Sequence, residues 1–485
     1  MSTPISKFHD TSTTVNADWH SAENRSGSDM KNLAGTRLLI DCSSTITCEF
    51  NSGIQRVVRA LCNEARVQSD AMTALPVFGK GGSWFEAKSL WPRSWRMRLP
   101  AAVSNSPLAR RYRQVAEAIY RRTGSRRFQQ LFLPAPGHSG IFKLPKKALA
   151  RIGRWIDRCS PAPEPVPLRS TDVLLMADAS WMIPNWEAIA VARAQGAAVG
   201  NVIYDLIPIT HPQFFPTQLV EMFGQWFDRT AKESDFFLCI SECVAAQTRQ
   251  QLVARGVDAQ RAHQMCHVFA LGADIRHAST DVAAAPEFQQ LFADQRCRSP
   301  HLILGTMEPR KNHSFVLDAF DELWRSGAQD TLCIVGRVGW NCEALMERIQ
   351  NHKYYQQKLF LFNNASDRDV CYAYRRAKSL IMASHTEGFG LPIVEALAFD
   401  QTVLASDTPI HREAGGKLAY YFPIDGDTQT LCSLIRECDT LATQDRYPLT
   451  ATLPATWRAS YQSLTHQTTR ALAQITTKTP LRQVA

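Results

Sequence analysis

The stretch His385-Thr386-Glu387-Gly388-Phe389-Gly390-Leu391-Pro392-Ile393-Val394-Glu395-Ala396 places a glycine-rich turn between two carboxylates. The residues before it, Leu380 to Ala383, are all apolar and predict a buried strand. Gly388 and Gly390 allow close approach of the backbone. Pro392 suits the first helical position, because the N–H that proline lacks would have no partner there. The pattern therefore predicts a strand, a tight turn and a helix that begins within the turn.

The start of this helix predicts a site for a phosphorylated sugar. Its free N–H groups and the positive end of its dipole favour phosphate or sugar oxygens. Glu395 lies about one turn inside the helix, within reach of a sugar hydroxyl, while Glu387 lies on the strand side of the turn. The alternative is that both glutamates are solvated acids at a helix end.

A second motif lies upstream, where His301-Leu302-Ile303-Leu304 predicts another buried strand and is followed by Gly305-Thr306-Met307-Glu308-Pro309-Arg310-Lys311-Asn312. Asn312 is a candidate N-cap for the amphipathic helix that comes next. Two fixed cations beside a helix start, Arg310 and Lys311, can stabilise the charge of a departing nucleoside diphosphate without a metal ion. The alternative is that they are surface charges.

Together, these motifs resemble the paired-glutamate signature and the Arg/Lys loop of the retaining glycosyltransferases of the GT-B fold, family 4. The resemblance implies an α/β fold of two facing, Rossmann-like, doubly wound lobes with a cleft between them. It implies that Arg310 and Lys311 contact the diphosphate of a nucleotide-sugar donor and that Glu395 holds the ribose. The transferred sugar, its phosphate and the nucleotide pocket are expected to involve Glu387, Gly388, Phe389, Gly390 and Leu391.

The same resemblance bears on the reaction. Retention in this family is commonly attributed to attack on the face from which the leaving group departs, with a diphosphate oxygen accepting the acceptor's proton. A covalent route through Glu387 remains the alternative. Asp205, after the predicted strand 199–204, is the expected sugar contact from the first lobe in preference to His211. Many relatives have His-Asp where this chain has Tyr204-Asp205. Ser241, after the strand 236–240, either faces the cleft or caps a helix.

The first lobe contributes a second loop, which precedes the run Gly53-Ile54-Gln55-Arg56-Val57-Val58-Arg59. Its apolar side chains share one helical face, so Gln55, Arg56 and Arg59 are expected to point outward. Gly53 at the helix start can approach a phosphate and is an expected donor contact. The run resembles a subset of family 4 enzymes from bacterial surface-polysaccharide assembly, where it also follows the first strand.

Apolar strand-like runs alternate with helical patterns in both halves of the 485-residue chain, which predicts α/β lobes. The expected strands are 37–41, 173–177, 199–204, 236–240, 301–304, 331–335, 358–362, 379–383 and 402–405. The expected divisions are a disordered tail (1–35), an acceptor-side domain (36–285) with a basic insertion at about 90–160, a nucleotide-sugar domain (286–453) and a C-terminal segment (454–485). By the resemblance, the helix in this last segment crosses back onto the first lobe.

The net charge of +9 is concentrated in segment 93–158, where basic residues strongly outnumber acidic ones and aromatic residues are interleaved. This pattern predicts either binding to an anionic membrane surface or a solvated helical insertion. No nucleic-acid partner is expected, because no nucleic-acid motif accompanies the charge. The sequence lacks a signal-peptide pattern and a long apolar run, so a cytoplasmic protein is expected. If the basic segment binds membrane, the protein would be peripheral on the inner face of the plasma membrane.

The 13 cysteines have no zinc-type spacing and are expected to be reduced. The two Asp-x-Asp tripeptides, 367–369 and 425–427, precede helical patterns and are interpreted as helix caps. No metal or other cofactor is therefore expected.

These observations predict a retaining hexosyltransferase that uses no metal. It would transfer a sugar, with mannose from GDP-mannose as the first guess, to a growing surface polysaccharide that is free or lipid-linked. Two alternatives stay open. One is a sugar phosphorylase of the same fold, and the other is a non-catalytic GT-B scaffold that binds glycan or membrane through the basic segment.

Overall fold

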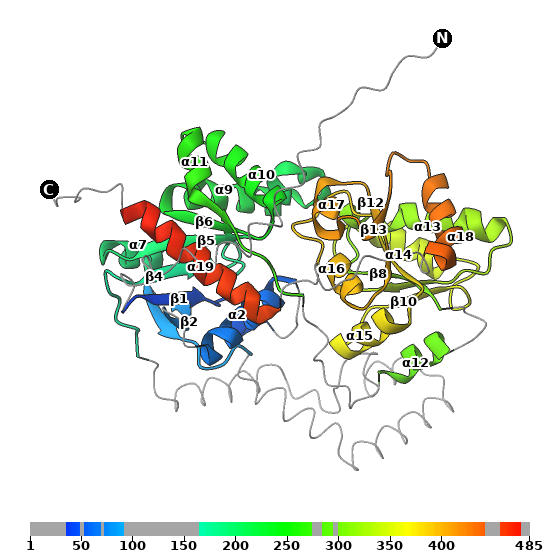
Figure 1. Ribbon diagram of the computed structural model, residues 1–485, viewed down its shortest axis with the longest axis horizontal. Helices are drawn as coiled ribbons and strands as arrows, with labels where there is room; N and C mark the ends of the chain where they lie inside the picture. Colours follow the sequence, from blue (N-terminus) through cyan, green and yellow to red (C-terminus); the bar gives the residue numbers. More distant parts are fainter. Residues whose placement is uncertain are drawn as a thin grey trace, which may run out of the picture.

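The computed structural model describes residues 35–48, 53–68, 72–91, 164–273, 284–293, 299–441 and 456–476. Two α/β lobes lie side by side, here named the N-lobe and the C-lobe (Figure 1). Residues 1–34, predicted as part of a disordered tail, and the basic segment 93–158 lie outside the described residues.

The N-lobe is built on a seven-stranded sheet in the order β3-β2-β1-β4-β5-β6-β7. All neighbouring strands pair in parallel except β2 and β3, which are antiparallel. Its elements are β1 (Arg37–Asp41), η3 (Thr45–Thr47), α2 (Gly53–Val67), β2 (Thr73–Lys80), β3 (Ser83–Glu86), β4 (Val173–Met176), α7 (Trp186–Ala194), β5 (Ala198–Ile203), α8 (Ile207–Thr210), η4 (Pro212–Phe214), α9 (Thr217–Glu233), β6 (Phe236–Cys239), α10 (Glu242–Val253), α11 (Ala259–Met265) and β7 (Cys266–Val268).

The C-lobe has a parallel six-stranded sheet in the order β10-β9-β8-β11-β12-β13. Its elements are α12 (Pro286–Ala293), β8 (His301–Leu304), η6 (Pro309–Lys311), α13 (His313–Arg325), β9 (Leu332–Val335), α14 (Glu343–Gln350), β10 (Leu359–Phe362), α15 (Asp367–Arg376), β11 (Ser379–Met382), α16 (Leu391–Ala398), β12 (Thr402–Ser406), α17 (Pro409–Gly415), β13 (Ala419–Phe422) and α18 (Gln429–Leu441).

The predicted fold class, two doubly wound α/β lobes, is confirmed. All nine predicted strands are present, and each of their ends lies within one residue of the prediction. The strands β2, β3, β7 and β13 were not predicted. β2 contains Pro76 and Gly79, which are uncommon inside strands, and β7 has only three residues. These strands are recognisable only by the neighbours with which they pair.

The last helix, α19 (Trp457–Thr476), lies across the N-lobe beside α2 (Figure 1). Tyr461, Leu464 and Ala471 are buried in the same apolar core as the strands β4 and β6 of the N-lobe. The chain therefore returns from the C-lobe to the lobe where it began.

The expectation that Gln55 and Arg59 point outward from α2 is wrong. Both are buried, with relative exposures of 8% and 4%. The guanidinium of Arg59 donates to the carbonyl groups of Thr45, Cys48 and Leu90. Helix α2 packs against the sheet on one side, and the segment around η3 covers it on another. The apolar periodicity of α2 does not reveal this second contact.

Two aspartates are buried at the carboxyl ends of the adjacent strands β1 and β4. Asp41 Oδ1 accepts from the Ser43 hydroxyl at 2.5 Å, while its Oδ2 is buried without a hydrogen-bond partner among the described residues. Asp178 Oδ2 accepts from the Thr45 amide at 2.6 Å. Burial, together with the charge of Asp178, raises the pKa of Asp41 to about 7.

This raised pKa predicts that the free energy of unfolding falls as pH increases from about 4 to about 7. Folded Asp41 keeps its proton in that window while the unfolded side chain has lost it, so deprotonation costs stability. We expect Asp41→Asn, which mimics the protonated acid, to remove a pH-dependent term on the order of 2–4 kcal/mol. Urea unfolding between pH 4 and pH 8 measures it. Glu221→Gln on the exposed surface of α9 is the control, and equal slopes in all three proteins would contradict the prediction.

Among the described residues, the helices are all too short or too polar to cross a bilayer. The cysteines of these residues are free thiols, as predicted, and nearly all of them are buried. Cys239 and Cys333, on β6 and β9, have no exposed surface, so they serve as small apolar core residues.

Candidate functional site

The glycine-rich turn joins β11 to α16 as predicted. Gly390 is the N-cap of α16 and has φ 85°, a conformation that glycine adopts without strain. Pro392 occupies the second helical position rather than the first. The backbone at Gly388 was expected to lie close to a ligand, but it lies close to the backbone of Tyr204 instead. A Cβ atom added at Gly388 would lie 2.1 Å from the carbonyl oxygen of Tyr204 in the N-lobe.

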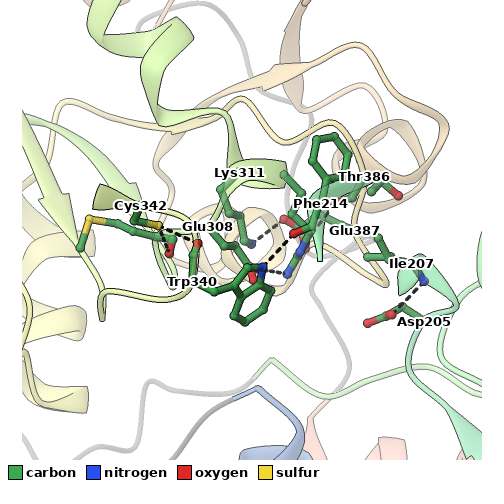
Figure 2. Close-up of polar contacts among 11 residues, drawn as sticks. Asp205, Ile207, Phe214, Glu308, Lys311, Trp340, Cys342, Thr386 and Glu387 are labelled. Atoms are coloured by element: carbon green, nitrogen blue, oxygen red, sulfur yellow. Dashed lines mark hydrogen bonds and ion pairs between the residues drawn. The ribbon is translucent and has the colours of Figure 1, made fainter. Parts of the chain in front are cut away.

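Arg310, Lys311 and Glu387 form one cluster between the loop after β8 and the turn after β11 (Figure 2). Arg310 Nη1 lies 2.6 Å from Glu387 Oε2, and Lys311 Nζ lies 2.5 Å from Glu387 Oε1. Arg310 Nη2 lies 2.6 Å from Glu308 Oε1. The amide of His385 donates to the Arg310 carbonyl, so the backbones of the two loops are also joined. Two motifs far apart in the sequence therefore build one charged site.

Electrostatic interactions within this cluster keep Glu387 and Arg310 ionised. Burial alone would raise the pKa of Glu387, but Arg310 and Lys311 outweigh it and hold that pKa well below its usual range. Burial raises the pKa of Glu308, and Arg310 opposes that rise. Burial favours a lower pKa for Arg310, but Glu387 and Glu308 raise it. Glu387 is thus a carboxylate with both oxygens engaged, and Arg310 is a permanent cation.

Asn312 stands at the N-cap position of α13, but its side chain makes no capping hydrogen bond. Its backbone is left-handed, with φ 55°. An extended backbone is typical of an N-cap that bonds the first turn, and the preceding 3₁₀ turn η6 prevents it here. The prediction of a side-chain cap is therefore wrong.

Asp205 lies on the other lobe, facing this cluster (Figure 2). The amide of Ile207 donates to Asp205 Oδ1 at 3.1 Å. Burial raises the pKa of Asp205, and the charge of Arg310 opposes that rise across the lobe interface. His211 is engaged instead with its neighbours, since its Nδ1 lies 2.9 Å from the Thr210 hydroxyl. Asp205 is thus in electrostatic range of the charged cluster, and His211 interacts electrostatically with His385, two residues before Glu387.

Glu395 is buried in the first turns of α16, with a relative exposure of 2%. Its Oε2 accepts from the Tyr374 hydroxyl at 2.9 Å. Its Oε1 lies 2.7 Å from Arg56 Nη1, which belongs to α2 of the N-lobe. Burial raises the pKa of Glu395, and Arg56 opposes that rise. The alternative that Glu395 is a solvated acid at a helix end is therefore wrong. Its partners Tyr374 and Arg56 are site residues that the sequence did not indicate.

The remaining predicted donor residues lie at the lobe interface or at its edge. Phe389 and Leu391 pack against the apolar core of the N-lobe. Gly53 begins α2, and a Cβ atom added there would meet no atom of the described residues within 4 Å. By this measure Gly53 is less crowded than Gly388, which lies against the Tyr204 carbonyl.

Further contacts across the interface were not predicted. Ser241 both caps α10 and donates to the carbonyl of Gly388 at 2.9 Å, so the two alternatives for this residue are both realised. Glu413 of α17 accepts from the amides at the start of α10. Trp340 Nε1 donates to the Phe214 carbonyl at 2.8 Å. The ring of Phe214 stacks on His385 with centroids 5.3 Å apart. The loops that carry the charged cluster are thus held against the N-lobe.

The Asp-x-Asp tripeptides cap helices, as predicted. Asp369 and Ser366 form a reciprocal capping box at the start of α15, and Asp427 accepts from the Gln429 amide at the start of α18. Within the described part of the chain, no three His, Cys, Asp or Glu side chains are grouped so that they could hold a metal ion.

The fold and site define the class of protein. Residues 301–419 match the family model described as "Glycosyl transferases group 1", and this segment contains the Arg/Lys loop and both glutamates. This segment belongs to that glycosyltransferase family, which confirms the family predicted from the two motifs.

Two curated relatives and one solved structure are similar to this chain. The chain is 30% identical over 345 residues to the "Serotype-specific mannosyltransferase WbdA" of Escherichia coli, a match that covers 68% of this chain and 42% of that relative. It is 33% identical over 107 residues to "O-antigen chain mannosyltransferase B" of E. coli, covering 22% and 28%. A crystal structure of Anabaena Alr3699/HepE in complex with UDP-glucose has a TM-score of 0.48 at 14% identity, covering 91% of this chain and 99% of that one. The matched part of this chain corresponds to less than half the length of WbdA.

Proposed function

We propose that this protein is a retaining glycosyltransferase that transfers a hexose from a nucleotide-sugar donor to a growing surface polysaccharide. The observation that carries the proposal is the joint cluster of Arg310, Lys311 and Glu387 beside the start of α16, where Glu395 stands. Mannose is the first candidate sugar, because WbdA is a serotype-specific mannosyltransferase and the second relative is an O-antigen chain mannosyltransferase.

The proposed roles follow from position and charge. Arg310 and Lys311 bind the diphosphate, and as preorganised cations they stabilise the charge that develops when it leaves. The open first turn of α16 adds N–H donors and the positive end of a helix dipole. Glu395 accepts from the ribose hydroxyls. Asp205 approaches the sugar from the N-lobe.

Glu387 is proposed to orient the two cations and the sugar rather than to attack it. Both of its oxygens are already engaged, one by Arg310 and one by Lys311. A carboxylate neutralised on both sides is a poor nucleophile, because attack requires one of these ion pairs to break in a buried site. This favours attack of the acceptor on the face that the diphosphate leaves, with a diphosphate oxygen taking the proton.

The proposal predicts release of nucleoside diphosphate from one nucleotide sugar in a panel of GDP-mannose, GDP-fucose, UDP-glucose, UDP-galactose and UDP-N-acetylglucosamine. We expect Glu395→Ala to raise the KM for that donor about tenfold or more, because a buried acceptor of ribose hydrogen bonds is lost. Glu347→Ala on the exposed face of α14 is the matched control. Release from none of the donors, with Glu395→Ala and wild type alike, would rule the proposal out. Dependence on free phosphate would indicate a phosphorylase instead.

We further propose that segment 93–158, which lies outside the described residues, binds anionic membrane. Its excess of arginine and lysine with interleaved aromatics favours attraction to anionic lipid that weakens as salt rises. Flotation with phosphatidylglycerol vesicles is expected to recover more protein than flotation with phosphatidylcholine vesicles. The excess should shrink when Arg110, Arg111 and Arg113 are changed to glutamine. Recovery that ignores lipid charge and salt would contradict this.

A further inference from the structure

The contact between Arg56 and Glu395 joins the two lobes at the position proposed for the ribose. Glu395 Oε2 is taken by Tyr374, so Oε1 is the oxygen left for a ligand, and Arg56 Nη1 lies 2.7 Å from it. The Glu395 side chain is 2% exposed and that of Arg56 is 22% exposed. A ribose hydroxyl that reaches Oε1 must therefore displace or crowd the guanidinium.

This contact is close but poorly aligned. Among the described residues, Glu395 Oε1 and Arg56 Nη2 are both buried without a well-aligned hydrogen bond, so the ion pair leaves hydrogen-bonding capacity unused on both side chains. Buried polar atoms that make no hydrogen bond retain most of their desolvation cost. An incoming ligand that offers a hydroxyl to Oε1 and an anionic oxygen to Arg56 would satisfy both atoms.

A nucleoside diphosphate has these two groups side by side. Removing one partner of a buried ion pair is strongly unfavourable, so the ribose cannot displace Arg56 cheaply unless the guanidinium finds another anion. The phosphate nearest the ribose supplies it within the same molecule. Arg56 stands one turn after Gly53, the proposed donor contact at the start of α2, so its side chain belongs to the proposed donor-binding edge of the N-lobe.

We propose that Arg56 is a donor-binding residue that the N-lobe supplies. In the ligand-free protein it pairs with Glu395. When the ribose hydroxyls donate to Glu395, the guanidinium moves to the phosphate nearest the ribose, so each buried charge exchanges one partner for another. The inference rests on the proposed function. It adds a third cationic residue to the donor site, from the lobe opposite Arg310 and Lys311.

Calorimetry with GDP, guanosine, UDP and uridine tests this in the wild type and in Arg56→Ala. For the diphosphate that the wild type prefers, we expect binding at least tenfold weaker in Arg56→Ala, because a charge-assisted contact is lost. Binding of the matching nucleoside should stay equal or become tighter, because its competitor for Glu395 is gone. Arg66→Ala, at the far end of α2, is the matched control and should bind both as wild type does. Arg56→Lys keeps the charge and should recover part of the loss.

Diphosphate binding that is unchanged or tighter in Arg56→Ala would overturn the inference, since Arg56 would then only occupy the ribose position. An equal loss for diphosphate and nucleoside would also overturn it, since Arg56 would then act by holding Glu395 in place. If Arg56→Ala fails to fold, Arg56→Lys decides, with weaker diphosphate binding expected and unchanged binding contradicting. Glu395→Ala and Arg310→Ala are measured in parallel. If neither weakens diphosphate binding, the proposed donor site itself fails, whereas a loss in both with none in Arg56→Ala removes only this inference.

Discussion

Replacing Arg310 by alanine is expected to lower the rate of sugar transfer by about 10²- to 10³-fold, the usual effect of removing one preorganised group that stabilises transition-state charge. Arg310 is the strongest candidate because it is buried, bonds two carboxylates and the Thr386 carbonyl, and keeps its charge at any working pH. The loss should appear mainly in kcat, because the negative charge on the diphosphate is greatest as it leaves.

Initial rates with the preferred nucleotide sugar measure this effect. Arg412→Ala is the matched control, because Arg412 lies exposed on α17 of the same lobe and pairs with the exposed Asp407. Arg310→Ala also removes the ion-pair partner of Glu308 and leaves Glu387 with Lys311 alone, and breaking such a buried pair costs about 3–5 kcal/mol. Thermal unfolding separates this loss from catalysis, and Arg310→Lys should restore stability more fully than rate. A folded Arg310→Ala protein with wild-type kcat would refute the assignment.

Gly388→Ala is expected to reduce transfer by about 10²-fold through displacement alone. The added methyl would lie 2.1 Å from the Tyr204 carbonyl oxygen, far inside van der Waals contact. The neighbouring atom belongs to backbone at the end of β5, so the turn after β11 must move away from the N-lobe. That movement shifts Glu387 next to it and weakens the hydrogen bond from Ser241 to the Gly388 carbonyl.

The matched control for this variant is Gly224→Ala within α9, where a Cβ atom would meet nothing within 4 Å. That change should leave transfer intact and add roughly 0.5–1 kcal/mol of stability, as alanine does in a helix. Transfer rates and small-angle scattering of both variants give the comparison. Gly388→Ala should separate the lobes slightly while each lobe stays folded. Wild-type transfer in Gly388→Ala would show that the close approach at the interface has no part in catalysis.

Much of the site could be read from local sequence. The runs of residues 301–312 and 380–396 specify a strand, a loop and a helix start each, because apolar strands, glycine and proline restrict the backbone locally. Both lie at the carboxyl ends of adjacent parallel strands, β8 and β11, so their side chains had to meet at one edge of the sheet. The joint placement of Arg310, Lys311 and Glu387 follows from that rule.

Local sequence was enough to predict the family, the alternation of strands and helices, and the two loops that carry the charged residues. The pairing of Arg56 with Glu395, the contact of Gly388 with Tyr204 and the burial of Arg59 are visible only in the folded protein. The physical reason is that periodicity and turn chemistry act between residues a few positions apart. Contacts between lobes depend instead on how two separately formed sheets, and the helix α19 that returns across one of them, pack against each other.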